Sequence, residues 1–526
     1  MGPLVEPSLR DPVSANTMLK HDRQAKLLLV CGFGLLYAYF FQGGGWNQNT
    51  HFDTARALVE RHTFELSAFS QNTGDVGRHE GKVYSNKGPG LALLTVPVYF
   101  VTHQLERALA PGADPARRAN MHAHIMTLFA SALPGVVLLL VLYCHFRRAQ
   151  GSIGESLCLA AAFGAGTLIF PFSGLLMSHV LTACTLFSTW YLVSRPPARN
   201  GTLFLAGSLV GLTVITDLLA APVTALFLFY VMRRYRPREI TGFIAGGAAV
   251  ALLFLVYNYA AFGSIFKTNQ TLEQKQFQTP DLLLGALQVP EPIRLYWLTF
   301  HPFRGLFHCC PVLLLPWLSW PRALRWRALR LETLVPLAVI FVFMLFNLSF
   351  NGWTGGWGVG PRYLIPMTPF LFSFALPGLR RARVPALLLM AASAGLMFCV
   401  TAVRVMVPGP TFGSAPNWDP VADCVEHVTR GEVAISTQGM LDYVPRAPSS
   451  ARWASYNLGE LFGLQGAISL LPAALVLGLL AVVALVTSRR ALTRRRTHGG
   501  RVAELPASAD VSQNVHKELD DQASVA

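Results

Sequence analysis

The sequence predicts an all-α integral membrane protein with about twelve transmembrane helices and a structured first outer loop that carries juxtamembrane helices. Of the 526 residues, 52% are hydrophobic and only 13% are charged, whereas soluble domains carry about 25% charged residues. Apolar runs of about 18 or more residues recur along most of the chain, and each is long enough to cross a hydrocarbon core of roughly 30 Å as a helix. Because backbone groups in lipid must be hydrogen-bonded within each span, these runs predict a helical bundle.

The distribution of arginines sets the predicted topology. The segment 1–25 is polar and ends near basic residues, so we expect it to be cytoplasmic. The apolar run 91–109 contains Pro97 and is followed by charged residues, so we expect it to lie along the membrane interface. The later arginine clusters then all fall on the cytoplasmic side, at 147–148, 195–199, 233–238, 322–330, 380–383 and 489–496. The predicted spans are 26–43, 121–144, 153–173, 178–194, 201–216, 220–235, 240–261, 305–320, 333–350, 363–379, 385–405 and 465–487.

This topology divides the chain into five parts. They are a cytoplasmic segment 1–25, a transmembrane core 26–405 with an outer loop 44–120, an outer subdomain 406–464, a last span 465–487, and a basic, then disordered, cytoplasmic tail 488–526. The net charge of +15 comes from arginine clusters between spans, which argues against nucleic acid as a partner. The eight cysteines include no CxxC pair, so we expect packing residues and not a metal or redox site.

The first outer loop holds the densest polar chemistry. Asp53 follows soon after the first span, and we expect it to open an amphipathic helix over 52–62. An outer carboxylate with an ordinary pKa near 4 could serve there as a general base, and a water-facing helix cap is the alternative. Tyr84 and Lys87 lie in a turn-rich segment where an ammonium could meet a lipid phosphate, although a lysine at this depth also suits simple snorkelling.

Later outer segments supply further candidate ligands. His301 and Arg304 stand at the mouth of a predicted span. In the segment 352–363, glycines let the backbone approach a ligand closely, Trp353 and Trp357 offer flat faces to a sugar ring or acyl chain, and Arg362 offers a fork for phosphate. The alternative for this segment is an aromatic-belt turn.

Four further polar residues carry weaker expectations. His122, His124 and His179 lie near the outer ends of predicted spans, and we expect packing or interfacial histidines there in preference to metal ligands. Asp217 follows a span on the outer side and could be a cap or part of a cavity.

With these residues in place, the chain resembles the GT-C superfamily of membrane glycosyltransferases, which includes protein mannosyltransferases and lipid A aminoarabinose transferases. It is most similar to bacterial members of unassigned substrate, and the resemblance covers about 26–405. The chain departs from the pattern at two places where relatives often have acids, because Thr54 follows Asp53 and Asn86 precedes Lys87. The motifs that carry the resemblance are the Asp53 loop, the Tyr84 to Gly90 turn, Tyr257-Asn258-Tyr259 with Phe262-Gly263, Arg304-Gly305 and Gly360-Pro361-Arg362-Tyr363.

The resemblance implies an inverting hexosyl or pentosyl transferase of the inner (plasma) membrane. Such an enzyme moves a sugar from a polyprenyl-phosphate donor to a glycan, lipid or protein acceptor at the outer face. Asp53 would be the catalytic base, and Lys87, Arg304 and Arg362 would hold the phosphate. The resemblance assigns no metal ligand and no certain cofactor, and it leaves room for a divalent metal. The other candidate substrate-binding residues are Tyr84, His301, Trp353 and Trp357.

Two other classes of function stay open. A transporter or flippase of lipid-linked glycans should carry ionisable or helix-breaking residues in mid-span at corresponding points of two halves, and the sequence shows few. A non-catalytic binding or scaffolding role is the other.

Overall fold

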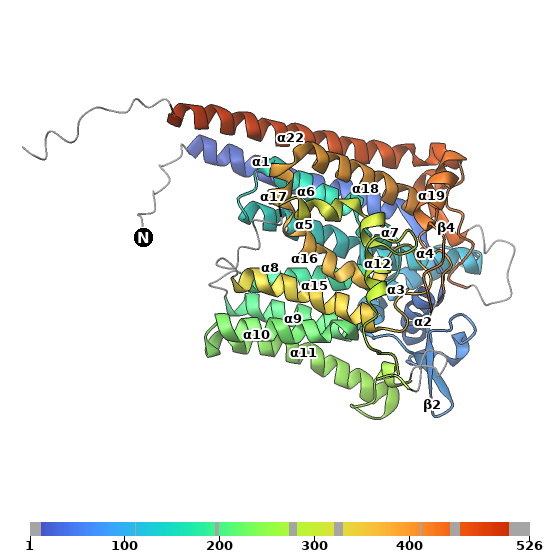
Figure 1. Cartoon of the computed structure of the whole chain (residues 1–526). Coiled ribbons are helices and arrows are strands. Elements are labelled where there is room, and N and C mark those ends of the chain that lie inside the picture. Colours follow the sequence, from blue (N-terminus) through green and yellow to red (C-terminus); the bar gives the residue numbers. More distant parts are fainter. Residues whose placement is uncertain are drawn as a thin grey trace, which may run out of the picture.

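The computed structural model describes residues 12–110, 112–194, 199–272, 281–283, 285–319, 330–410, 413–441 and 453–503, and helices dominate these residues (Figure 1). The α-helices are α1 (Pro12–Tyr39), α2 (Trp46–Arg61), α3 (Gly90–Leu109), α4 (Pro115–Thr127), α5 (Leu133–Arg148), α6 (Ile153–Gly166), α7 (Ile169–Ser173), α8 (Ser178–Val193), α9 (Asn200–Thr216), α10 (Ala221–Arg234), α11 (Pro237–Phe262), α12 (Pro292–Thr299), α13 (Leu306–Cys309), α15 (Leu331–Ser349), α16 (Thr368–Phe372), α17 (Ala375–Arg381), α18 (Arg383–Val403), α19 (Pro420–Thr429), α21 (Leu458–Leu461) and α22 (Leu471–Ala503).

Tighter turns and short strands complete the described structure. The 3₁₀ turns are η1 (Ser67–Phe69), η3 (Leu218–Ala220), η4 (Asn269–Leu272), η6 (Pro311–Ser319), η8 (Arg362–Met367) and η9 (Gly466–Leu470), and η2 (Leu128–Ala132) is a π-helical turn that joins α4 to α5. The strands are β1 (Phe40–Gln42), β2 (Val76–His79), β3 (Lys82–Ser85) and β4 (Ser455–Asn457).

The protein is a multi-pass membrane protein. In the described part of the chain, five helical segments are long and apolar enough to cross a membrane by length and composition: Pro115–Arg148, Pro237–Phe262, Leu331–Ser349, Arg383–Val403 and Gly466–Ser488. Two shorter apolar helices, α6 and α9, accompany them. The helix α3 over the predicted interfacial run is not among the five. The total of about twelve spans stays a prediction.

Three predicted spans are divided into separate helical pieces. The predicted span 153–173 consists of α6 and α7, the described part of 305–320 consists of α13 and η6, and 363–379 consists of η8, α16 and α17. Proline explains the last two interruptions, because it lacks the N–H that an α-helix needs and its ring collides with the preceding turn. Pro311 and Pro316 lie in 305–320, and Pro366 lies in 363–379.

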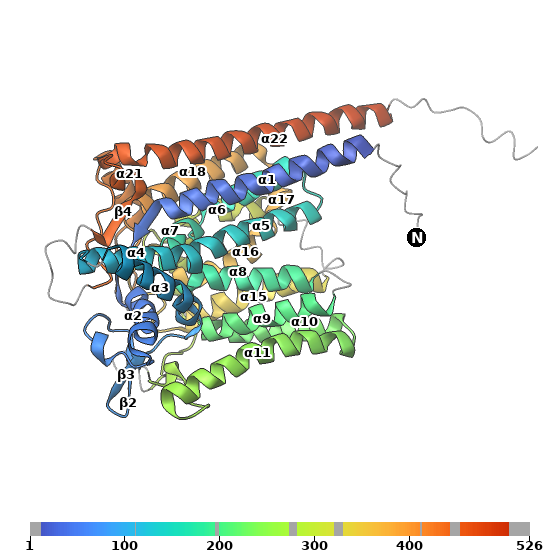
Figure 2. The ribbon, with the colours of Figure 1, turned by 180° about the vertical axis from the view of Figure 1, so that it is seen from behind.

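The helices lie side by side, and the outer elements gather at one end of the bundle. Figures 1 and 2 show α2, α3, β2 and β4 at one end, whereas α1 begins and α22 finishes at the opposite end. The assignment of these two ends of the bundle to the outer and cytoplasmic sides stays a prediction. All eight cysteines are free thiols.

A short sheet ties the outer segment 406–464 to the end of the first predicted span. Strand β1 pairs with β4 in antiparallel register, from Phe40 opposite Asn457 to Gln42 opposite Ser455. The Gly44 N–H, at the start of the first outer loop, contacts Met440 Sδ at 3.1 Å. The described part of 406–464 therefore packs on the first outer loop as well.

Some sequence-based expectations fall on residues that the structure does not describe. They are most of the predicted disordered tail, at 504–526, the arginines Arg195, Arg322, Arg325 and Arg327, and residues 442–452 of the outer segment.

Candidate functional site

Asp53 lies in the interior of α2, so the expectation that it opens or caps this helix is wrong. The helix begins at Trp46, about two turns earlier, with Gly45 in the N-terminal cap position. Gly44 and Gly45 have φ angles of 82° and 81°, a conformation that glycine adopts without strain. These glycines let the chain turn directly after β1, and the helix can therefore start before the polar pattern suggests.

The Asp53 carboxylate is fully buried. Its Oδ2 accepts a hydrogen bond from Asn72 Nδ2 at 2.8 Å, and its Oδ1 has no partner in the described part of the chain. Asn72 Nδ2 also donates to the Met440 carbonyl at 2.6 Å, so the outer segment covers this site. Burial raises the pKa of Asp53 to about 7, although the Asn72 hydrogen bond and the Arg56 charge act to lower it. The expected ordinary pKa near 4 is therefore wrong.

A tight turn places Lys87 against the end of α9. A Cβ on Gly88 would lie 2.5 Å from the Ile215 carbonyl oxygen, and one on Gly90 would lie 2.3 Å from the Thr216 Oγ1. A Cβ at either position would collide with the end of α9, which explains why glycine stands on both sides of Pro89. The Lys87 Nζ lies 3.3 Å from Asp75 Oδ1, so its ammonium is held at this point.

Asp217 follows α9, and the charges of two cations from other parts of the sequence affect its pKa. Its carboxylate accepts a hydrogen bond from the Leu219 N–H at 3.3 Å and caps η3. Burial raises the pKa of Asp217 to about 6, while the Leu219 hydrogen bond and the charges of Lys87 and Arg362 act to lower it. Lys87 and Arg362 therefore lie within electrostatic range of one carboxylate, although they are far apart in sequence.

Arg362 opens η8 directly after the glycine-rich segment. Its Nη2 donates to the Tyr363 hydroxyl at 3.4 Å, and its Nη1 lies 4.0 Å from Met177 Sδ. Its Nε is buried without a partner among the described residues. The Tyr363 ring packs edge-on against His179, with 5.8 Å between ring centroids. These contacts are all uncharged, so the guanidinium retains the capacity to bind an anion.

The start of α8 adds positive potential at the same point. Met177, which Arg362 contacts, occupies the N-terminal cap position of α8, and no side chain caps this helix. The first N–H groups of a helix have no intrahelical partner, and the helix dipole is positive there. A phosphate beside Arg362 would therefore meet a helix N-terminus as well.

Several buried polar atoms close to Lys87, His179, Asp217 and Arg362 in the chain have no hydrogen-bond partner among the described residues. They are Asn86 Nδ2 and Oδ1, His179 Nδ1, Thr216 Oγ1 and Arg362 Nε. Buried polar atoms in folded proteins are nearly always hydrogen-bonded, so an accumulation of unpartnered atoms indicates a bound water, ion or ligand. The residues that lie within electrostatic range of Lys87 or Arg362 at this point are called the Lys87–Arg362 cluster. Besides these two cations, they are His51, Asp75, His179 and Asp217.

His51 joins the cluster from α2 as a neutral side chain. It is 2% exposed, and burial lowers its pKa to about 3, with the Lys87 charge lowering and the Asp75 charge raising it. Asp53 lies two residues further along the same helix, about 200° around its axis. The structure therefore places Asp53 on the face of α2 that meets Asn72, and His51 on the face that meets the cluster.

Arg304 holds the glycine-rich segment in place. It is fully buried, its Nε donates to the Thr354 carbonyl at 2.8 Å and its Nη2 to the Gly356 carbonyl at 2.6 Å. Burial, together with the positive charge of Arg362, lowers the pKa of Arg304 to about 9, so the guanidinium stays charged at neutral pH. Two of its hydrogen bonds thus go to backbone carbonyls of the segment that precedes Arg362, and a third runs from Nη1 to the Phe303 carbonyl at 3.3 Å.

The glycines of this segment adopt conformations that other residues rarely reach. Positive φ angles occur at Gly355 (71°), Gly356 (63°), Gly358 (134°) and Gly360 (69°). A chain of L-residues could not follow this path without strain. The glycines thus shape the backbone that Arg304 binds and that delivers Arg362 to the cluster.

The two tryptophans of the segment differ in environment. Trp353 is 1% exposed, stacks on Trp297 with 5.1 Å between ring centroids, and donates from Nε1 to the Gly413 carbonyl at 3.0 Å. Trp357 is 42% exposed. Only Trp357 therefore presents a free ring face to lipid or a ligand.

Tyr84 and His301 make local packing contacts. Tyr84 is buried in β3 and lies edge-on to Phe262, with 5.1 Å between ring centroids. His301 accepts a hydrogen bond at Nδ1 from the Phe303 N–H at 3.1 Å. The described contacts thus pack Tyr84 of β3 against α11 and hold His301 in its turn.

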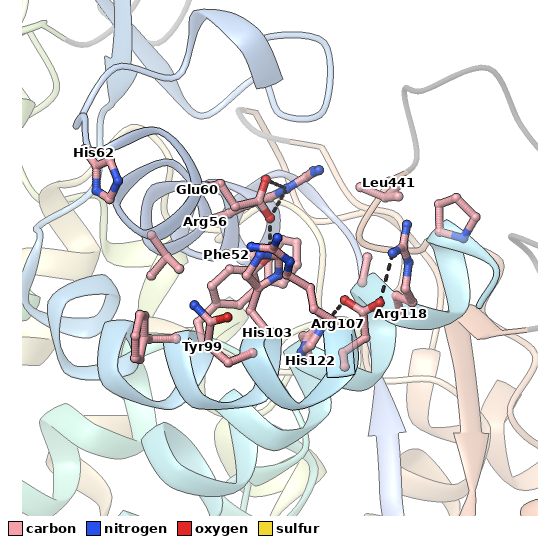
Figure 3. Close-up of a pocket in the computed structure, with 16 residues that line it drawn as sticks. Phe52, Arg56, Glu60, His62, Tyr99, His103, Arg107, Arg118, His122 and Leu441 are labelled. Carbon is pink, nitrogen blue, oxygen red and sulfur yellow. Dashed lines mark hydrogen bonds and ion pairs between the residues drawn. The ribbon is translucent and has the colours of Figure 1, made fainter. Parts of the chain in front are cut away.

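A pocket of about 550 Å³ opens between α2, α3 and α4 (Figure 3). Arg56, Glu60, Tyr99, His103 and His122 are among the residues that line it. Sequence reasoning did not single out this pocket. The available signal was the pair His103 and Glu106, whose spacing of three residues puts both on one face of a helix.

Comparisons with known proteins give few matches. No family model matches the chain, and no curated protein shows significant similarity to it. Among solved structures, the chain is similar to ArnT from Cupriavidus metallidurans bound to undecaprenyl phosphate, with 14% identity, a TM-score of 0.45, and coverage of 90% of this chain and 76% of that chain. The apo state of the same protein gives 14% identity, a TM-score of 0.46, and coverage of 90% and 75%. At this level, the similarity assigns neither a substrate nor residue roles to this chain.

Proposed function

We propose that the protein is an inverting membrane glycosyltransferase of the inner (plasma) membrane. It moves a sugar from a polyprenyl-phosphate donor to a glycan, lipid or protein acceptor at the outer face. The observation that carries this proposal is the convergence of Lys87 and Arg362, which both act on Asp217, with the uncapped N-terminus of α8. The sequence motifs that resemble GT-C glycosyltransferases supply the same two cations.

The cluster has the chemistry that a departing phosphate needs. An anion that forms as the glycosidic bond breaks gains from charge-assisted hydrogen bonds. In the proposal, Arg362 offers a planar fork, Lys87 offers a point charge held by Asp75, and the first N–H groups of α8 complete the site. Arg304 is a positioning residue that fixes the segment before Arg362.

Two carboxylates compete for the role of general base. The family resemblance assigns the base to Asp53, whose pKa of about 7 lies in the range that suits a base at neutral pH. Asp53 is covered by the Met440 segment, so acceptor entry requires this segment to move. The second candidate is Asp217, because burial raises its pKa to about 6; as the base of an inverting transfer it would have to reach the acceptor on the face of the sugar opposite the phosphate. The variants Asp53→Asn and Asp217→Asn distinguish the two, because replacing the general base should lower turnover roughly 100-fold or more.

Binding of polyprenyl phosphate tests the donor site directly. Lys87→Gln and Arg362→Gln should each weaken binding about 10- to 100-fold, because each removes a hydrogen bond to a charged group worth about 1.5–3 kcal/mol. Lys82→Gln and Arg430→Gln are matched controls, since Lys82 is 58% exposed and Arg430 is 59% exposed. Equal affinity of all four variants and the parent would refute the phosphate role of the cluster.

A further inference from the structure

The pocket between α2, α3 and α4 contains a group of metal-ligating side chains apart from the Lys87–Arg362 cluster. His103 and Glu106 lie one turn apart on α3, and His122 projects from α4. One ligand atom from each of the three lies within 4.8 Å of the other two. His122 is buried, and the other two side chains are partly exposed to the pocket.

The spacing of these atoms is close to that of a bound zinc ion. Two ligands bound at about 2.0–2.1 Å and at the tetrahedral angle lie about 3.4 Å apart. His122 Nε2 lies 3.7 Å from Glu106 Oε2. Small side-chain rotations therefore suffice to bring the three ligand atoms to a common ion.

The surroundings orient these ligands. Arg118 donates to Glu106 Oε1 at 3.0 Å, which leaves Oε2 directed at His122 (Figure 3). The Tyr99 ring stacks on the His103 imidazole, with 5.7 Å between ring centroids and an angle of 13°. Tyr99 in turn donates to Glu60 Oε1 at 2.5 Å. Such outer contacts, which fix the carboxylate and the ring planes, are typical of metal sites.

We propose that His103, Glu106 and His122 bind a divalent transition-metal ion of the zinc type, with its remaining coordination position open to the pocket. Two imidazoles and one carboxylate form a ligand set that zinc accepts. Three protein ligands leave a fourth position for water or for an oxygen atom of a ligand in the pocket. The ion would also tie α3 to α4.

This site is independent of the proposed transferase activity, because its ligands belong to neither the cluster nor the pair of candidate bases. The test therefore uses metal binding and not turnover. Protein purified through a tag without histidine, and stripped with a chelator, is titrated with Co²⁺ while its visible absorption is followed. The parent should bind one Co²⁺ per chain with a spectrum of low coordination number, and Zn²⁺ should displace it.

Variants separate this site from other histidines. His103→Asn, Glu106→Gln and His122→Asn should each weaken Co²⁺ binding at least 10-fold, since even outer contacts of metal ligands are worth 10- to 100-fold. His62→Asn is the matched control, because His62 lines the same pocket with a φ of 54° that asparagine tolerates.

Folding is checked by the unfolding temperature without metal. If His122→Asn does not fold, because His122 is buried, Co²⁺ binding by the His103→Asn variant still tests the proposal. A parent that takes up no Co²⁺, or ligand variants that bind as tightly as His62→Asn, would overturn the proposal.

Discussion

Replacing Asp53 by asparagine should leave the stability of the protein equal or lower at acid pH, and should raise it at alkaline pH. Burial raises the pKa of Asp53 from 3.8 to about 7, so the unfolded chain releases this proton at lower pH than the folded protein. The carboxylate therefore lowers the parent's stability progressively as the pH rises from about 4 to about 7. Three pKa units at 1.36 kcal/mol each give a cost of about 4 kcal/mol at pH 8 and none below pH 4.

Asparagine removes this pH-dependent cost and introduces a smaller constant one. Its Oδ1 can still accept from Asn72, but its amide would occupy the place of Oδ1, which has no partner. An unsatisfied buried donor costs about 1–3 kcal/mol. We therefore expect the variant to equal or fall below the parent in stability at pH 4, and to exceed it by about 1–3 kcal/mol at pH 8.

The assay is unfolding of parent and variant in detergent between pH 4 and pH 8, followed by tryptophan fluorescence. Glu426→Gln is the control, because this carboxylate is 59% exposed and its replacement should change stability by no more than about 0.5 kcal/mol. A difference between Asp53→Asn and the parent that stays constant across this pH range would refute the buried, proton-retaining carboxylate.

Three further predictions follow from the same structure. If Asp53 is the general base, turnover of the parent should rise through about pH 7, and Asp53→Asn should lower it roughly 100-fold. Near-parental turnover of Asp53→Asn would instead assign the role to Asp217. Gly88→Ala should cost about 1–3 kcal/mol, because its Cβ meets a backbone carbonyl at 2.5 Å, whereas Gly201→Ala, whose Cβ would have no atom of the described residues within 4 Å, should be tolerated. After replacement of Cys31, the exposed native cysteine, a membrane-impermeant thiol reagent applied to intact cells should label a cysteine introduced at position 357 and not one introduced at position 234. The reverse pattern would invert the topology.

The positions of the helices could be predicted because membrane insertion depends on a simple property, the length of an apolar run. The predicted span 201–216 and helix α9 nearly coincide, and the predicted span 385–405 overlaps α18 over most of its length. Interruptions were harder to foresee, because a proline can kink a membrane helix or end it, and neighbouring elements decide which. The start of α2 depended on Gly44 and Gly45, whose backbone angles the sequence does not fix.

The site was predictable in residue type and less so in arrangement. Both Arg304 and Arg362 lie within two residues of a glycine at the outer ends of predicted spans, and the sequence offers no means of distinguishing them. The structure does so through contacts, since Arg304 meets backbone carbonyls and Arg362 meets uncharged side chains. Likewise, the pairing of His103 with His122 depends on the packing of α3 against α4.

Turnover of a defined donor tests the central claim most directly. The purified protein is incubated with a panel of polyprenyl-phosphate sugars and candidate acceptors, and the release of polyprenyl phosphate is measured for the parent, for Lys87→Gln and for Arg362→Gln. The account predicts release by the parent with at least one sugar and a loss of at least 10-fold in both variants, while Lys82→Gln keeps the parental rate. Intact transfer of the lipid-linked sugar across vesicles without release of polyprenyl phosphate would contradict it, and would identify a transporter.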